Sequence, residues 1–296
     1  MDLLSRMTLD QKIGQMTQSE RIACTPEEVK NYHLGSVLSG GGSAPGENLA
    51  ADWVTMNDDY WAASMEEDEN HLAIPVIYGV DAIHGHNNVR GATVFPQNIG
   101  LGAANDPDLL QLIAQITARE ILATGVDWAF APTLAVARDN HWGRTYESYS
   151  EDPAIVSSYS GRVVKGLQGD LGTDSIVACV KHWVGDGGTS HGIDQGETTL
   201  SWDELERVHI SPYYPALDAG ALTVMASFNS WNGDKCHGHK YLLTDVLKNQ
   251  MAFDGYIISD WDGIDYLSND YYLAVAEGVN AGIDMFMVPE NWKPFI

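Results

Sequence analysis

The sequence predicts an α/β protein, a closed (β/α)8 TIM-like barrel that fills residues 1–296 as one domain. Short apolar runs recur along the chain with helical patterns between most of them, and strands that alternate with helices form a parallel sheet. Seven or eight such runs favour a closed barrel over an open sheet, and 296 residues exceed the about 250 that a barrel takes. Acids and bases stand at the downstream ends of several runs, which is the catalytic end of a parallel barrel.

Each predicted strand is a short apolar run rich in β-branched or aromatic residues. The segment IGQMTQSE (13–20) is an irregular first strand, and little sequence follows the last run, so we expect the final barrel helix to be missing. The clear runs, in chain order, are GSVLSG (35–40), PVIYGVD (75–81), VDWAFAP (126–132), IVACVKHW (176–183), LTVMASFN (222–229), GYIISDW (255–261) and IDMFMVP (283–289).

Helix signals lie between these runs. Residues 105–125 predict a helix, because Pro107 suits a first turn, apolar residues repeat at helical spacing, and Gly125 suits the end. A capping box pairs a serine or threonine with a glutamine or glutamate three residues later, and so marks the start of a helix. We predict helix starts at two of them, Thr8 with Gln11 and Ser201 with Glu204.

The composition narrows the class of partner. The chain has 16 basic and 41 acidic residues, a net charge of −25, which disfavours nucleic acids and anionic membranes and suits a neutral substrate. The negative charge also has a simpler explanation, since a high net charge keeps a protein soluble. Cys24, Cys179 and Cys236 are too few and too scattered for a disulfide framework. The start lacks the features of a signal peptide, so in a periplasmic or extracellular protein, the location we expect, this chain would begin after the signal.

Polar residues follow four separate predicted strands. They are Asp81, the adjacent Lys181 and His182, Asn229, and Asp260. Asp260 is the most unusual, because an acid closes a buried apolar strand, where an unpaired charge is costly. Such a convergence of donors and acceptors at one end of a barrel suits a ligand with many hydroxyl groups.

Two further segments add candidates. In ARDNHWGRTYESYSEDP (137–153), Arg144 could reach into a cleft as a fork of donors, whereas Arg138 and Glu147 more readily form ion pairs that hold the loop. Trp261 follows Asp260 directly, and its ring could stack on a sugar at the lip of the cleft.

The motifs GVDAIHG, RDNHWGRTYESYSEDP, KHWVGDGGT and GYIISDW, with MTLDQKIGQM near the start, resemble glycoside hydrolase family 3, the β-glucosidase and exo-β-glucanase family. The likeness covers nearly the whole chain. It implies a retaining exo-acting enzyme that cleaves terminal β-linked glucose through a covalent glycosyl-enzyme on Asp260. A retaining mechanism pairs an ionised nucleophile with a protonated acid about 5–5.5 Å away. We expect Lys181 and Arg144 to favour the ionised form of Asp260.

The resemblance also implies the roles of the surrounding residues. The hydroxyl groups of the terminal sugar would be held by Asp81, Arg144, Lys181 and His182. Met225 would lie beside that sugar, and Trp261 would form one wall of the next subsite. The substrate would be a β-linked gluco-oligosaccharide or glucoside, with no metal, cofactor, nucleic acid or membrane involved.

The acid/base is where this sequence departs from the family pattern. In two-domain members it is a glutamate from a following α/β sandwich domain, and this chain stops just past the last predicted strand, so we expect it to be truncated before that domain. Glu197 is the best candidate inside the chain. A single-domain branch, the β-N-acetylglucosaminidases, uses a His and an Asp on the equivalent loop, where His191 and Asp194 lie without that branch's spacing.

Two alternatives from other classes stay open. Without its acid/base, the chain could be a sugar-binding but nearly inactive module. A metal-dependent amidohydrolase barrel could use His84, His86, Lys181 and Asp260, but neighbours on a strand point to opposite faces, which counts against the adjacent Lys181 and His182 as parts of one site. A metal cluster at Cys236, His237 and His239 lacks a second group at zinc-finger spacing.

Overall fold

Eight parallel strands form the central sheet of the computed structural model, which describes residues 2–296. Each strand pairs with the next along the chain, and a bridge between Ile258 and Met285 joins the last strand to its predecessor, which closes the barrel. In order around the sheet, the strands are β10 (Tyr256–Ile258), β7 (Thr223–Ala226), β5 (Val177–Trp183), β4 (Trp128–Ala129), β3 (Ile77–Val80), β2 (Ser36–Ser39), β1 (Thr17–Glu20) and β11 (Phe286–Met287).

The predicted (β/α)8 barrel is confirmed, and a strand lies within each predicted run. The strands are shorter than the runs, because several runs continue as irregular backbone that still bonds to its neighbour. After β4, for example, the carbonyls of Ala131 and Pro132 accept from Cys179 and Lys181 of β5. A small separate sheet of β6 (Glu197–Thr198), β8 (Ser230–Trp231) and β9 (Asp234–Lys235) forms on the loops beyond the barrel.

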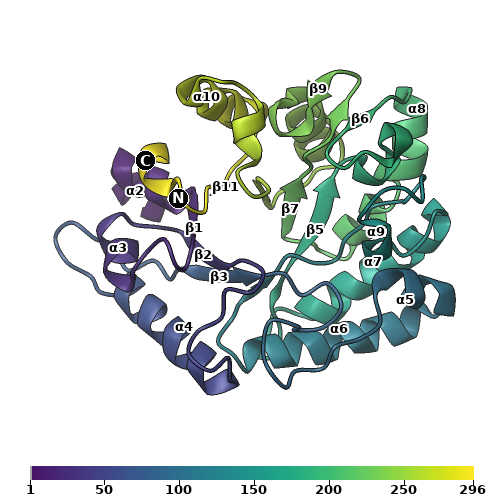
Figure 1. Cartoon of the computed structure of the whole chain (residues 1–296). Helices are drawn as coiled ribbons and strands as arrows, with labels where there is room; N and C mark the ends of the chain where they lie inside the picture. The colour runs from purple at the N-terminus through teal and green to yellow at the C-terminus, as the bar shows by residue number, and fades with distance from the viewer. Residues whose placement is uncertain (1) are drawn as a thin grey trace.

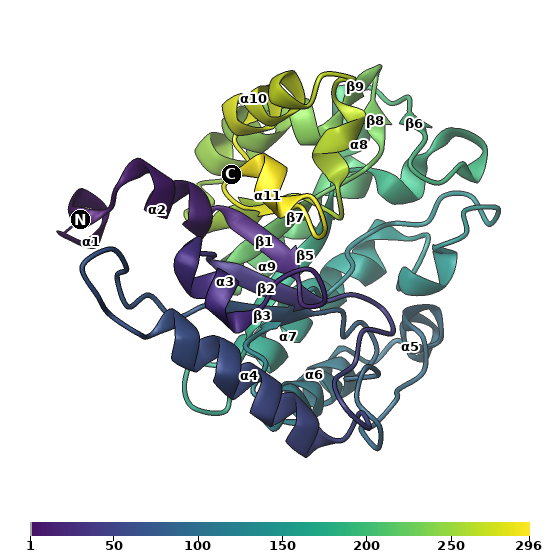
Figure 2. The same cartoon turned by 60° about the vertical axis from the view of Figure 1, so that its left-hand side comes forward.

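Helices surround the barrel, with α4, α6 and α7 packed along its outside (Figures 1 and 2). Both capping boxes form, and Asp106 caps the helix predicted over 105–125. The helices are α1 (Asp2–Arg6), α2 (Leu9–Gln15), α3 (Pro26–Asn31), α4 (Ala50–Ser64), α5 (Asn98–Ala104), α6 (Pro107–Leu122), α7 (Pro153–Gln168), α8 (Trp202–Leu205), α9 (Tyr213–Asp218), α10 (Tyr271–Ala281) and α11 (Trp292–Phe295), with π-helical segments at Glu206–Ile210 and Tyr241–Gln250.

The expected absence of a final helix holds only in part. One turn, α11, follows β11, because Trp292 buries its ring and its indole N–H donates to the carbonyl of Ala23. Within residues 2–296, no helix is long and apolar enough to cross a membrane.

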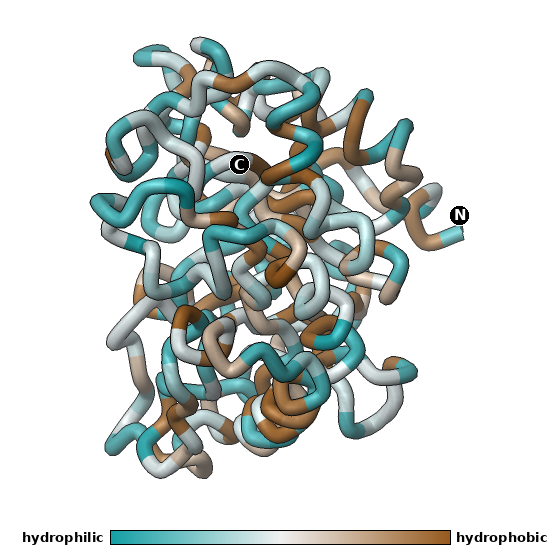
Figure 3. Tube along the Cα trace, turned by 90° about the vertical axis from the view of Figure 1, so that its right-hand side faces the viewer, coloured by the Kyte–Doolittle hydropathy of each residue, from teal (hydrophilic) through white to brown (hydrophobic). Residues whose placement is uncertain are grey.

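The core has two main parts. The larger lies between the strands and the surrounding helices, and hydrophilic segments run along the outer loops in Figure 3. The smaller fills the barrel and supports the candidate site at its carboxyl end. Gly79 makes room there for Phe130, since a Cβ at Gly79 would overlap that ring. The inner cluster comprises Leu38, Trp128, Phe130, Cys179, Met225, Ile258, Met285 and Met287.

Helix α5 holds the loop that carries Arg144. The Asn98 side chain donates to the carbonyl of Glu147 at 2.8 Å, and Gly102 packs directly on the backbone of Tyr149. A Cβ at Gly102 would overlap the Tyr149 carbonyl oxygen, and the rotation of a side chain cannot relieve a clash with backbone.

We therefore expect Gly102→Ala to lower the free energy of unfolding by about 2 kcal/mol or more, because α5 must move away from the loop. Gly100→Ala on the same helix is the matched control. Its Cβ would meet only Pro96 at 3.7 Å, and alanine favours a helix by about 0.5–1 kcal/mol over glycine. Urea unfolding measures both. Equal effects of the two substitutions would contradict this packing.

Candidate active site

A cavity of about 290 Å³ opens at the carboxyl ends of the strands. It contains the seven residues that the resemblance placed in one site, although they come from separate strands and loops. Asn229, the remaining polar residue at a strand end, does not line it, because its buried side chain donates to Val184 and Thr198 instead. Glu197 is not among the lining residues. The cavity is lined by Leu38, Asp81, Ile83, Phe130, Arg144, Glu147, Lys181, His182, Met225, Asp260, Trp261 and Met287.

Asp260 follows β10 and is one of the residues that line this cavity. Its Oδ1 accepts the backbone N–H of Trp261 at 2.7 Å, and its own N–H donates to His237 Nε2 at 2.9 Å. Its Oδ2 has no hydrogen-bond partner among the described residues. The Nε2 atom of His182 lies 3.6 Å from Oδ2. The local structure thus fixes the carboxylate through one oxygen and leaves the other buried without a hydrogen-bond partner.

Burial dominates the electrostatics of Asp260. The side chain is only 13% exposed, and burial raises the pKa of its carboxyl to about 6. Lys181, the Trp261 N–H and Arg144 each act to lower that pKa, as expected of cations and a donor, but they offset burial only in part. The group is therefore ionised at neutral pH and takes up a proton in mildly acidic solution.

Lys181 and Asp81 form an ion pair in the cavity wall, with Lys181 Nζ donating to Asp81 Oδ1. The lysine is almost fully buried, whereas the Asp81 side chain is 51% exposed. Burial opposes the charged lysine, but the nearby carboxylates of Asp81 and Glu147 outweigh it and raise the pKa of Lys181. The pair therefore offers a fixed cation and an accessible carboxylate side by side.

A second set of contacts orients His182 through Arg144. Arg144 makes two hydrogen bonds to Glu147, at 2.7 and 2.9 Å, so the ion pair expected of Glu147 forms with Arg144. Arg138, which was also expected to form an ion pair, donates to the backbone carbonyl of Glu151 instead. Its NH2 also lies 3.2 Å from His182 Nε2, while His182 Nδ1 lies 2.7 Å from Asp186 Oδ2. Burial, followed by the charges of Arg144 and Lys181, lowers the pKa of His182. The neutral ring that satisfies these contacts donates from Nδ1 and accepts at Nε2.

Lys181 and His182 both line the cavity, which strict alternation along a strand does not allow. The physical reason is an irregularity in β5, whose pairing register with β7 shifts between Val180 and Trp183. Such a bulge turns successive side chains away from their alternating directions. The argument from alternation against a shared site was therefore wrong for this pair.

Apolar groups form the remaining walls. Met225 is buried beside Phe130 at the floor, and Trp261 stands at the rim with 37% of its surface exposed. Gly40 makes room for the Trp261 ring, because a Cβ at Gly40 would lie 2.9 Å from two of its ring carbons. The cavity thus combines polar groups on one side with an aromatic face at the mouth.

The sequence analysis missed two supporting residues. Asp186 lies four positions after His182 in the motif KHWVGDGGT, and that spacing was a signal for the pair. His237 was considered only as a metal ligand, yet it accepts the N–H of Asp260, and burial lowers the pKa of its ring to about 3. Neither residue lines the cavity, so both act by positioning residues that do.

The other candidates lie outside this cavity. The Glu197 side chain accepts the N–H of Gly233, Asp194 accepts the indole N–H of Trp142, and His191 is exposed. His84 bonds to the carbonyl of Phe95, and His86 to Thr124. Over the described range 2–296, no three histidine, cysteine or acidic side chains are placed to hold a metal ion.

The raised pKa of Asp260 predicts that its charge destabilises the fold. The folded pKa of about 6 exceeds the reference value of 3.8, so the penalty is absent at low pH and complete above about pH 6. Asp260→Asn should raise the free energy of unfolding by about 1–3 kcal/mol at pH 7.5 and by much less at pH 4.5. Urea unfolding at both pH values measures this change, and Asp59→Asn, at an exposed aspartate, is the control that should change the free energy of unfolding little at either pH. If Asp260→Asn does not raise the free energy of unfolding at pH 7.5, the carboxylate is not destabilised by burial.

Residues 8–295 match the family described as "Glycosyl hydrolase family 3 N terminal domain". The structure of exo-1,3/1,4-beta-glucanase from a Pseudoalteromonas species superposes with a TM-score of 0.95 and 48% identity, over 99% of this chain and 38% of that one. The structure of Listeria innocua beta-glucosidase in complex with isofagomine superposes with a TM-score of 0.84 and 31% identity, over 98% of this chain and 41% of that one.

Curated relatives agree with these structures. The lysosomal beta glucosidase of Dictyostelium discoideum is 32% identical over 97% of this chain and 39% of its own length. The periplasmic beta-glucosidase of Salmonella typhimurium is 31% identical over 100% of this chain and 38% of its own. The chain thus spans about two fifths of each relative. With its barrel and converging polar residues, it belongs to glycosyl hydrolase family 3, as an N-terminal domain.

Proposed function

We propose that this chain is the catalytic barrel of a retaining, exo-acting β-glucosidase or exo-β-glucanase with Asp260 as its nucleophile. The observation that carries the proposal is that Asp260 lines the cavity and that one oxygen of its buried carboxylate, Oδ2, has no hydrogen-bond partner among the described residues. In the first step, Oδ2 bonds to the anomeric carbon while the bond from that carbon to the glycosidic oxygen breaks, and that oxygen takes a proton from an acid. Water then attacks the anomeric carbon, gives a proton to the resulting base and frees the Asp260 carboxylate.

The walls of the cavity support a single terminal sugar as the bound group. Asp81 can accept from hydroxyl groups, while Lys181 and Arg144 donate, so that each sugar hydroxyl meets a complementary partner. The neutral His182 adds a further contact, oriented through Asp186. Met225 lies under the ring and Trp261 forms a wall for the next sugar. A cavity of about 290 Å³ suits an enzyme that cleaves from a chain end.

None of the carboxyl groups that line the cavity is placed to act as the acid of this mechanism. Besides Asp260 the cavity has two, and each forms an ion pair: Asp81 with Lys181 and Glu147 with Arg144. Glu197, the internal candidate, bonds to Gly233 instead. We therefore propose that a second domain of the whole protein supplies the acid. Residues 1–296 alone would then bind sugar and cleave only bonds whose leaving group needs no protonation.

The similar proteins support β-linked glucosides as the substrate class. One is an exo-1,3/1,4-beta-glucanase, and the Listeria innocua beta-glucosidase has been solved with glucose and, as a mutant, with laminaribiose. Two of the relatives are periplasmic by name, which supports a periplasmic or extracellular location. The net charge of −25 is compatible with a neutral substrate of this kind.

Covalent labelling tests the proposed nucleophile. A 2-deoxy-2-fluoro-β-glucoside with a dinitrophenolate leaving group needs no acid, so this chain should trap a glycosyl group on Asp260. Mass spectrometry of the peptide that contains GYIISDW locates the label. Asp260→Asn should remain unlabelled, whereas Asp262→Asn, a matched change two residues away, should label normally. A label on any other residue, or labelling of Asp260→Asn, would refute the assignment.

A further inference from the structure

A second cavity, of about 350 Å³, lies at the opposite end of the barrel from Asp260. Val76, which precedes β3, and Asp127, which precedes β4, both line it, so it opens at the amino ends of these strands. Its other wall is helix α4, which contributes Asn57, Asp58 and Trp61. The site described above lies at the carboxyl ends, so the two cavities are separate.

The polar side chains around this cavity supply acceptors. Asn57 is only 6% exposed, its Nδ2 donates to the carbonyl of Thr124 at 2.9 Å, and its Oδ1 has no partner among the described residues. Asp58 and Asp127 add carboxylates, and neither forms an ion pair within the described part of the chain. Ionised carboxylates only accept hydrogen bonds, so the cavity suits a ligand that brings several donors.

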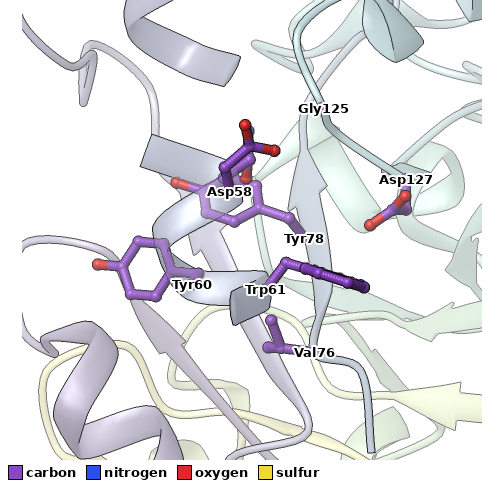
Figure 4. A pocket seen from close by; sticks show the side chains of 8 residues that line it. Asp58, Tyr60, Trp61, Val76, Tyr78, Gly125 and Asp127 are labelled. Carbon is purple, nitrogen blue, oxygen red and sulfur yellow. The ribbon is translucent and has the colours of Figure 1, made fainter. Parts of the chain in front are cut away.

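Trp61 supplies an aromatic face next to these acceptors. It is 54% exposed, although the fold buries most other tryptophans, and it lies on the last turn of α4. Figure 4 shows the indole edge-on, extending from α4 toward the side where Asp127 lies, with Val76 below it. A flat apolar surface beside oxygen acceptors matches a pyranose ring, which presents C–H groups on its faces and hydroxyl donors at its edge.

We propose that this cavity is a non-catalytic site that binds one or two pyranose units of a neutral β-glucan chain. The Trp61 indole stacks on a sugar ring, and the carboxylates of Asp58 and Asp127 accept from its hydroxyl groups. No lysine or arginine lines the cavity within the described residues, so phosphate and other anions have no donor of opposite charge there. The choice of β-glucan rests on the proposed function, whereas the preference for a neutral polyol rests on the cavity itself.

Such a site would act by raising the local concentration of substrate. A polymer held at the amino end of the barrel remains tethered to the molecule while its chain end reaches the catalytic cavity. Binding at Trp61 therefore needs neither Asp260 nor Trp261. This independence lets the two sites be measured separately.

Affinity electrophoresis of Asp260→Asn in gels that contain laminarin tests the proposal, because this parent does not hydrolyse the polymer. Adding Trp61→Ala should raise the dissociation constant for laminarin about tenfold or more, whereas Trp61→Phe, which keeps an aromatic face, should retain much of the binding. Tyr272→Ala, which removes a 79% exposed aromatic on α10, is the matched control and should bind as the parent does. Thermal unfolding checks that each variant folds.

The outcomes separate this site from the catalytic one. Trp261→Ala added to the parent should leave retardation by laminarin largely intact. The proposal is overturned if Trp61→Ala is retarded as strongly as the parent, or if Trp261→Ala alone abolishes retardation, which would place all binding in the catalytic cavity. It is also overturned if Trp61 variants change the binding of an alkylammonium probe and not of laminarin, since the cavity would then be a cation site. The covalent-labelling test of Asp260 is independent of these experiments, so either proposal can fail without the other.

Discussion

Burying the Asp260 carboxylate costs free energy, and the surrounding groups offset that cost only in part. One oxygen is fixed by the Trp261 N–H, while the other has no partner among the described residues. Lys181 and Arg144 lower the pKa of the carboxyl, yet burial keeps it near 6. A carboxylate held in this way is ionised at neutral pH and poorly solvated. These are the properties that make a carboxylate reactive toward an electrophilic carbon.

The polar neighbours of Asp260 are themselves held by partners that a ligand would not displace. Arg144 is anchored by Glu147, His182 by Asp186, and the loop under Arg144 by α5. Rigid donors and acceptors lose little entropy when a sugar binds, and they keep the directions that recognition of its hydroxyl groups requires. The inner hydrophobic cluster of the barrel supports this arrangement from below.

Much of this arrangement could be predicted from the sequence, because apolar runs mark the strands and polar residues follow them. The motifs then placed Asp81, Lys181 and Asp260 in one site. What could not be predicted depends on three-dimensional detail. The bulge in β5, which lets the side chains of Lys181 and His182 line the same cavity, cannot be recognised from the periodicity of the sequence. The second cavity could not be predicted either, because Trp61 and Asp127 come from separate segments at the amino ends of the strands and share no sequence motif.

The central claim is that Asp260 is a buried, ionisable carboxyl group with one free oxygen. Carbon-13 NMR of the chain labelled at its aspartate carboxyl carbons tests this most directly. One resonance should titrate near pH 6, be absent from Asp260→Asn, and shift when a sugar occupies the cavity. A spectrum in which the resonance lost in Asp260→Asn titrates below about pH 4, or ignores the sugar, would contradict it.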